Sequence, residues 1–125
     1  MINRYSRKEL TTIWSEENKY KIWLDVEIAA AQEMEKLGQI PKGVSSTVKR
    51  KAKINVDRIH AIEAKVKHDV IAFLTSVTEK AGINVRYLHQ GMTSSDVLDT
   101  SFNIQLVQSG KILLKDIDLI LKVLK

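Results

Sequence analysis

The sequence predicts an all-α protein, and three observations lead to this fold class. Apolar residues recur at steps of three and four along most of the chain, which is the spacing of one face of an α-helix. No stretch of useful length alternates between apolar and polar residues as a half-buried strand does. One proline and five glycines among 125 residues leave long segments without helix breakers. With 44% apolar and 28% charged residues, the composition is that of a globular chain.

Two helical segments are expected in the first forty residues. Residues 7–13 form a short amphipathic turn or helix. Ser15 can cap the next helix, because an acidic pair follows it in the first turn, where the helix dipole favours negative charge. Gly38 followed by Pro41 ends that helix. Its expected buried face consists of Tyr20, Trp23, Leu24, Ala30, Ala31, Met34 and Leu37.

Further segments are expected before the last helix. A shorter helix spans residues 41–52, and Asn55 can cap the one that follows. An apolar pattern then continues in nearly one phase as far as Gly82, so the periodicity leaves open whether the helix breaks around His68. Residues 84–92 are expected to form a loop with one helical turn.

The last segment is expected to be one long helix over residues 93–125. Thr93 and Asp96 make a capping-box-like start, with the acid replacing the commoner Glu or Gln. Apolar side chains cover most of the circumference, so the helix needs several neighbours, and its length of about 50 Å exceeds what a small domain can surround. One stripe on it is Leu106, Leu113, Ile117, Ile120 and Leu124.

We therefore interpret the chain as the N-terminal piece of a larger helical protein. Residues 1–92 would form an N-terminal helical domain, and residues 93–125 would begin a second domain. A coiled-coil tail is the alternative for the last helix, but the width of its apolar surface disfavours it. Charged residues interrupt every apolar run of the length that a membrane span needs.

Charge and cysteine content narrow the class of function. The net charge of +5 and the basic cluster at residues 49–53 keep a nucleic-acid-binding helical module open as an alternative, although few aromatic residues accompany the cluster. A structural or interaction domain is a second alternative. The absence of cysteine excludes a disulfide scaffold and a thiolate nucleophile. The first residues lack the apolar core of a signal peptide, so a cytoplasmic location is expected.

Two polar clusters are candidate binding sites. Arg4 and Tyr5 combine a guanidinium fork with a phenol, a pair that can hold a phosphate, although terminal pairs of this kind are commonly surface residues. Lys67, His68 and Asp69 combine a cation, an imidazole and a carboxylate, which suits a doubly charged substrate and proton transfer near neutral pH. A solvated helix end is the alternative for this second cluster.

A third cluster lies at the start of the long helix. Thr93 and Ser94 place hydroxyl groups where the first amide N–H groups attract carboxylates or phosphates, and His89 lies just before them. A plain solvated N-cap is the alternative. His60 is expected on the surface. The three histidines lack the spacing of a metal site, so no metal is expected.

Together, these motifs resemble the adenylosuccinate lyase family of the fumarase/aspartase superfamily. The resemblance covers the whole chain and rests on Arg4-Tyr5, on Lys67-His68-Asp69-Val70 and on residues 91–100, GMTSSDVLDT. The last block alone occurs in looser form across the superfamily, whereas the combination is specific to this family. A cycloisomerase of the carboxymuconate type has a similar block, but its substrate lacks a phosphate and the Arg4-Tyr5 pair argues against it.

The resemblance implies a carbon–nitrogen lyase of purine biosynthesis. Such an enzyme removes a proton beside a succinyl carboxylate and releases fumarate by β-elimination. Its substrates are adenylosuccinate, which gives AMP, and the succinyl-carboxamide ribotide. No cofactor or metal is implied, because hydrogen bonds to the carboxylate stabilise the carbanion. Residues 93–125 would be the truncated first long helix of a central helical bundle shared by a homotetramer, with each active site built from three subunits and no nucleic acid or membrane as partner.

The resemblance also implies roles for the first two clusters. Arg4 and Tyr5 would contact the nucleotide phosphate and ribose. Lys67, His68 and Asp69 would line the substrate site, with His68 assisting the general acid or holding the substrate.

For the third cluster, the resemblance implies that Thr93 and Ser94 hold a succinyl carboxylate in preference to the phosphate, while His89 approaches the phosphate. The general acid histidine and the catalytic serine of the family lie on later segments and have no counterpart here. The 125 residues alone are therefore expected to be inactive and to dimerise through the apolar last helix.

Overall fold

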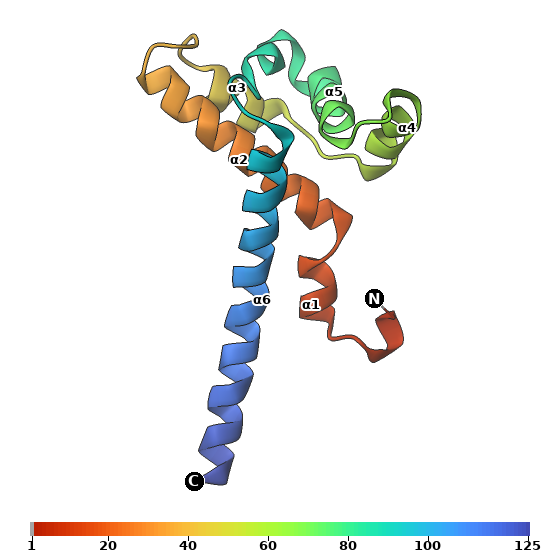
Figure 1. Cartoon of the computed structure of the whole chain (residues 1–125), viewed down its shortest axis with the longest axis vertical. Coiled ribbons are helices and arrows are strands. Elements are labelled where there is room, and N and C mark those ends of the chain that lie inside the picture. The colour runs from red at the N-terminus through yellow and green to blue at the C-terminus, as the bar shows by residue number, and fades with distance from the viewer. Residues whose placement is uncertain (1) are drawn as a thin grey trace.

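The computed structural model describes residues 2–125 and confirms the all-α prediction, with no strand among these residues. Helices α2 to α5 gather at one end of the molecule, and α6 extends far away from them (Figure 1). The helices are α1 (Lys8–Ile13), α2 (Glu16–Lys36), α3 (Val44–Lys51), α4 (Val56–Val66), α5 (Asp69–Ala81) and α6 (Ser94–Leu124), with 3-10 helices η1 (Asn3–Tyr5) and η2 (Gly82–Tyr87).

Side-chain caps begin the helices where the sequence predicts them. The Ser15 hydroxyl accepts the N–H of Asn18 at 3.2 Å at the start of α2. Asn55 Oδ1 accepts the N–H of Arg58 at 2.9 Å at the start of α4. These bonds satisfy amide groups that have no partner inside the helix. They place the helix boundaries within a residue of the predicted ones.

The helix does break at His68, which settles the question that periodicity left open. Lys67 ends α4 in the left-handed conformation, with φ of 56°. His68 is extended and caps α5, because its Nδ1 accepts the N–H of Ile71 at 3.3 Å. An exposed ion pair also links the two helices. Arg58 Nε lies 3.0 and 3.1 Å from the two carboxylate oxygens of Glu79, and Nη2 donates to Oε1 at 2.5 Å.

An aromatic cluster forms the centre of the core. The ring of Phe73 on α5 stacks on Tyr20 at 6.0 Å between centroids and meets the edge of Trp23 at 5.5 Å. All three side chains are buried. One residue of the buried face predicted for α2 is wrongly placed there. Leu37 is the C-cap residue and is 72% exposed, because α2 ends before another turn brings this position back to the core.

Helix α3 begins at Val44, three residues later than predicted. Gly43, the N-cap residue, has a left-handed φ of 88°, and it has no side chain with which to cap the helix. The cap comes instead from Glu35 on α2, whose carboxylate accepts the N–H of Ser45 at 2.6 Å and that of Gly43 at 3.2 Å. The hydrogen bond from the Ser45 backbone is the main reason that the pKa of Glu35 lies below its usual range.

Replacing Glu35 by glutamine is expected to destabilise the fold by about 0.5–2 kcal/mol at neutral pH, the usual effect of losing a helix cap. A folded-state pKa below the unfolded one means that the stabilisation is full above the unfolded pKa and is lost as the pH falls through the folded pKa. Urea unfolding should therefore show a difference in free energy of unfolding between the wild-type chain and Glu35→Gln, and this difference should become smaller at acidic pH. Glu33→Gln is the control, since Glu33 makes only an exposed ion pair with Lys36. An equal effect of both changes would contradict the capping role.

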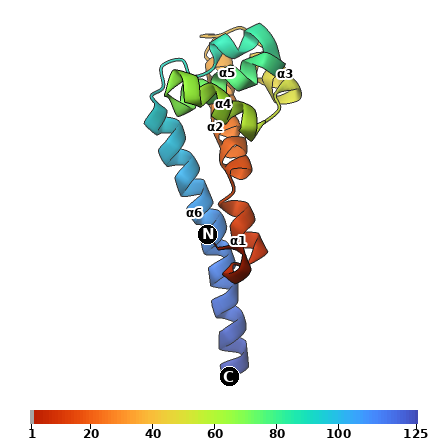
Figure 2. The same cartoon turned by 90° about the vertical axis from the view of Figure 1, so that its right-hand side faces the viewer.

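Helix α6 packs on the rest of the chain through a mainly polar stripe. Its buried residues are Val97, Ser101, Gln105 and Ser109, spaced four apart. Gln105 Nε2 donates to the carbonyl of Ile13 at 2.8 Å, which joins α6 to the end of α1. Both views show α1 lying beside α6 (Figures 1 and 2).

The apolar stripe predicted on α6 is not buried within this chain. The packed face is the polar one, and the last turns of α6 extend beyond α1 and every other helix (Figure 2). No helix among residues 2–125 is long and apolar enough to cross a membrane. The division of the chain at residue 92 stays a prediction. The large apolar side chains exposed on α6 are Phe102, Ile104, Leu106, Val107, Leu113, Leu114, Ile117, Leu119, Ile120, Leu121, Val123 and Leu124.

Candidate functional site

The three predicted clusters lie in three different parts of the structure. Arg4 and Tyr5 belong to η1 near the N-terminus, residues 67–69 join α4 to α5, and residues 93 and 94 begin α6. Figure 1 shows η1 well away from helices α2 to α5, with α4 at the edge of that group of helices and the start of α6 near its centre. Within residues 2–125 no hydrogen bond or ion pair connects two of the clusters. The single chain therefore does not assemble them into one site.

The Arg4–Tyr5 pair is open to a ligand. The guanidinium carbon of Arg4 lies 4.8 Å from the centre of the Tyr5 ring, within the range of a cation–π contact. Both side chains are exposed, with Tyr5 at 75%. The contact orients the guanidinium group while leaving its N–H groups accessible to an anion.

In the second cluster, His68 and Asp69 each make a hydrogen bond with a neighbouring backbone group. Because Nδ1 of His68 accepts a backbone N–H, its ring proton lies on Nε2, where it can be donated. Asp69 Oδ1 accepts the N–H of Val70 at 2.7 Å and lies 3.6 Å from His68 Nδ1. Lys67 is exposed. The cluster thus presents a cation and an N–H donor at one corner, a combination suited to a carboxylate.

A shallow hollow lies beside this corner. His60, Glu63, Ala64 and Lys67 line it. His60 is exposed, as predicted, and its Nε2 lies 3.0 Å from Glu16 Oε1. That hydrogen bond lowers the pKa of Glu16. Beneath the surface, burial raises the pKa of Tyr20 to about 12, and nearby carboxylates add to the shift, so the phenol stays neutral at physiological pH.

The third cluster has the predicted helix start. Thr93 is the N-cap of α6, and its N–H donates to Asp96 Oδ2 at 2.8 Å, which is one arm of the capping box. Ser94 is half-buried and Thr93 is exposed. The first N–H groups of α6 and the two hydroxyl groups therefore remain at the helix terminus, where an anion is favoured.

Sequence reasoning missed Glu27, which organises the segment before α6. Its carboxylate is fully buried, accepts the N–H of His89 at 2.8 Å and lies 2.7 Å from His89 Nδ1. His89 has a left-handed φ of 58°. One signal in the sequence points to Glu27, because it follows Trp23 and precedes Ala31 by four residues and so places an acid on the buried face of α2.

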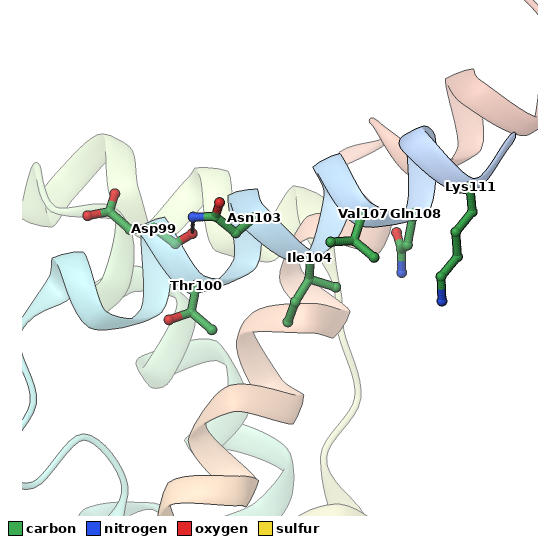
Figure 3. A pocket seen from close by; sticks show the side chains of 7 residues that line it. All are labelled: Asp99, Thr100, Asn103, Ile104, Val107, Gln108 and Lys111. Carbon is green, nitrogen blue, oxygen red and sulfur yellow. Dashed lines mark hydrogen bonds between the residues drawn. The ribbon is translucent and has the colours of Figure 1, made fainter. Parts of the chain in front are cut away.

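Another open hollow lies along α6 and contains none of the predicted site residues. It occupies about 620 Å³ along α6 and combines apolar and polar side chains of that helix alone. Figure 3 shows Thr100, Ile104 and Lys111 extending to one side of α6. Among residues 2–125 no group of three or more metal-binding side chains is present. The residues lining the hollow are Asp99, Thr100, Asn103, Ile104, Val107, Gln108 and Lys111.

Comparison with known proteins agrees with the resemblance seen in the sequence. The chain is 45% identical to an adenylosuccinate lyase of Streptococcus mutans over 99% of its length, and that match covers 29% of the relative. Adenylosuccinate lyases of Thermotoga maritima and Synechocystis sp. are also 45% identical, over 94% and 100% of the chain and 27% and 29% of their own lengths. No family model matches the chain.

The fold agrees with a solved structure. A fumarate lyase from Mesorhizobium sp. BNC1 superposes with a TM-score of 0.81 at 20% identity, covering 90% of this chain and 27% of that one. The chain is homologous to the N-terminal region of adenylosuccinate lyases and spans less than a third of the length of these relatives. The resemblance and the fold class predicted from the sequence are thus confirmed.

Proposed function

We propose that this chain is part of an adenylosuccinate lyase that releases fumarate from a succinyl nucleotide by β-elimination. The observation that carries the proposal is 45% identity to such enzymes over essentially the whole chain. In the reaction, a base takes the proton from the carbon beside one succinyl carboxylate. The carbon–nitrogen bond on the neighbouring carbon then breaks, and the nitrogen receives a proton as the nucleotide leaves. The two substrates proposed are adenylosuccinate and the succinyl-carboxamide ribotide.

Each cluster has a part in this proposal that its chemistry supports. The exposed guanidinium of Arg4, beside Tyr5, suits the nucleotide phosphate. The Nε2–H of His68 suits proton donation or a hydrogen bond to the substrate. Thr93 and Ser94 suit a succinyl carboxylate, since they stand at the start of a long helix. The principal general acid and base are proposed to lie on segments that this sequence does not contain.

The separation of the clusters supports a site built by more than one copy of the chain. A substrate cannot touch η1, the corner between α4 and α5 and the start of α6 of one copy at the same time, because these places lie far apart (Figure 1). We propose that the full-length protein is a homotetramer in which the α6 helices form a shared bundle. The apolar surface of α6, which is exposed in the single chain, supports this assembly.

The function can be tested in a chimera. This chain would replace the matching N-terminal part of the Streptococcus mutans relative, to which it is 45% identical. Fumarate release from adenylosuccinate is expected, because the remaining segments supply the groups that this chain lacks. The 125-residue chain alone is expected to release none. A folded, tetrameric chimera without activity would argue against the proposal, and turnover by the chain alone would overturn the assignment of the principal acid and base to other segments.

Arg4→Lys in the chimera is expected to lower kcat/KM by the equivalent of about 1–3 kcal/mol, the range for a hydrogen bond to a charged group. Lysine keeps the charge but loses the two-pronged guanidinium contact with a phosphate. Arg50→Lys, an exposed position at the end of α3, is the matched control and should change nothing. Equal kinetics of the two variants would remove Arg4 from the site.

The 125-residue chain is expected to self-associate in solution, with a two-fold dimer formed by antiparallel pairing of residues 105–124. Burying each exposed Leu or Ile of α6 contributes roughly 1.5–3 kcal/mol, so a few of them outweigh the entropy lost when two chains pair. Light scattering at about 100 μM would measure the mass. Leu113→Glu with Ile117→Glu should give monomers, whereas Lys122→Glu should not. A strictly monomeric wild-type chain with α6 intact would contradict this expectation.

A further inference from the structure

A buried acid with a single histidine as its partner is the least expected polar feature of this fold. Glu27 is 0% exposed, and both carboxylate oxygens contact the same residue, His89, one through the backbone N–H at 2.8 Å and one through the ring Nδ1 at 2.7 Å. Withdrawing a carboxylate from water is costly unless donors satisfy it. His89 supplies these donors from a segment 62 residues away in sequence.

The short contact favours a proton on one of the two ring nitrogens of His89. An ionised carboxylate can only accept a hydrogen bond, so ionised Glu27, 2.7 Å from Nδ1, pairs with a proton on that nitrogen. With Nδ1 occupied in this way, any gain or loss of a proton by the ring takes place at Nε2. The ring keeps 22% of its side-chain surface exposed, so it remains accessible although its partner is not.

The same contact also holds the main chain in an uncommon conformation. A left-handed φ such as the 58° of His89 is infrequent for a residue other than glycine and costs free energy that the surroundings must supply. An anchor for the loop alone would need only one acceptor, for the N–H group. The second oxygen of Glu27 goes to the imidazole, and this contact fixes the plane and the proton of the ring, not merely the path of the loop.

We infer that Glu27 is a positioning residue that keeps Nδ1 of His89 protonated and reserves Nε2 as the ring nitrogen for a ligand beside the start of α6. His89 lies four residues before Thr93, the N-cap of α6, so the ring is close in sequence to the N–H groups and hydroxyls of that helix terminus. When Nε2 is protonated as well, the ring is a cation, and its Nε2–H can donate to an anionic group. The identity of this anion as part of a succinyl nucleotide rests on the proposed function. The protonation pattern of the ring does not.

Long-range ¹H–¹⁵N correlation spectra of the chain with labelled histidine would test the inference in the ligand-free protein. His89 should show a protonated Nδ1 at neutral pH. The other histidines are internal references: His68 should show an unprotonated Nδ1, because that atom accepts the Ile71 N–H, and His60 should show a protonated Nε2 beside Glu16. An unprotonated Nδ1 in His89 of the wild-type chain would overturn the inference without any variant.

Glu27→Gln supplies the second arm of the test. The glutamine carbonyl can still accept the backbone N–H of His89, but its NH₂ group then faces Nδ1 and favours the opposite tautomer. Loss of the protonated Nδ1 signal from His89, with His68 and His60 unchanged, is the expected result. An unchanged His89 spectrum in a folded variant would overturn the inference.

Titration with inorganic phosphate tests the ligand half. The ¹⁵N chemical shift of His89 Nε2 should change as phosphate is added to the wild-type chain. Glu27→Gln should weaken the apparent affinity for phosphate about tenfold, as expected for one charge-assisted hydrogen bond. No shift at His89 at any phosphate concentration would overturn the ligand role. An inactive chimera whose His89 still has a protonated Nδ1 would count against the proposed function and leave the role of Glu27 standing.

Discussion

Replacing Phe73 by alanine is expected to destabilise the chain by about 3–5 kcal/mol, the usual cost of removing a buried aromatic ring. The Phe73 side chain is fully buried, and its ring lies 6.0 Å from Tyr20 and 5.5 Å from Trp23 between centroids. Removing it leaves a cavity between α2 and α5 that the rigid helices cannot close. A loss of this size is a large share of the stability of an ordinary domain. Urea unfolding followed by circular dichroism would measure it.

Phe102→Ala is the matched control for this experiment. Phe102 is also a phenylalanine in contact with another aromatic residue, since its ring lies 5.9 Å from that of Trp14, but it is 51% exposed on α6. We expect a loss of less than about 1 kcal/mol, because the side chain is already largely in water. The comparison should be made at low protein concentration, where self-association through α6 contributes little. Equal losses in the two variants would mean that the aromatic cluster is not the centre of the core.

His68→Ala in the chimera is expected to reduce turnover about 10²-fold or more, the scale of a positioned acid–base group. The structure adds a second consequence that the sequence does not reveal. His68 also caps α5 through its Nδ1, so the alanine variant should lose about 0.5–2 kcal/mol of stability as well. Fumarate release and urea unfolding would measure the two effects separately.

His68→Asn distinguishes the two roles of this residue. Asparagine is among the best N-cap residues, so it should restore the start of α5, but it has no imidazole with which to transfer a proton. We expect the asparagine variant to be stable and as slow as the alanine variant. Recovery of turnover to within a factor of a few would mean that His68 serves the helix alone.

Local features explain why so much of the fold could be predicted. Ser15, Asn55 and Thr93 cap helices whose first turns lie within the next few residues, so the sequence contains both partners of each contact. The same holds for Gly82 after α5, where a φ of 77° suits glycine. The resemblance at residues 67–70 and 91–100 is local in the same sense, because each motif is a short run of neighbouring side chains.

Features that depend on distant partners could not be predicted. The start of α3 is set by Glu35, eight and ten residues before the N–H groups that it accepts. The role of Glu27 depends on His89, and nothing near Glu27 in the sequence announces that partner. Ser101, Gln105 and Ser109 form the packed face of α6 because α1 and α2 lie there, whereas hydropathy alone selects the opposite, apolar side.

The sequence by itself thus determined the helical class, most helix ends, the three polar clusters and the similarity to fumarate-releasing lyases. These properties depend on the period of the apolar residues and on contacts within one helical turn, which the order of residues states directly. Only the tertiary structure decided that the helix breaks at His68, that Glu27 holds His89, and that the clusters stay apart within one chain. Those outcomes depend on which segments meet in space, and many chain paths have the same local pattern but bring different residues together.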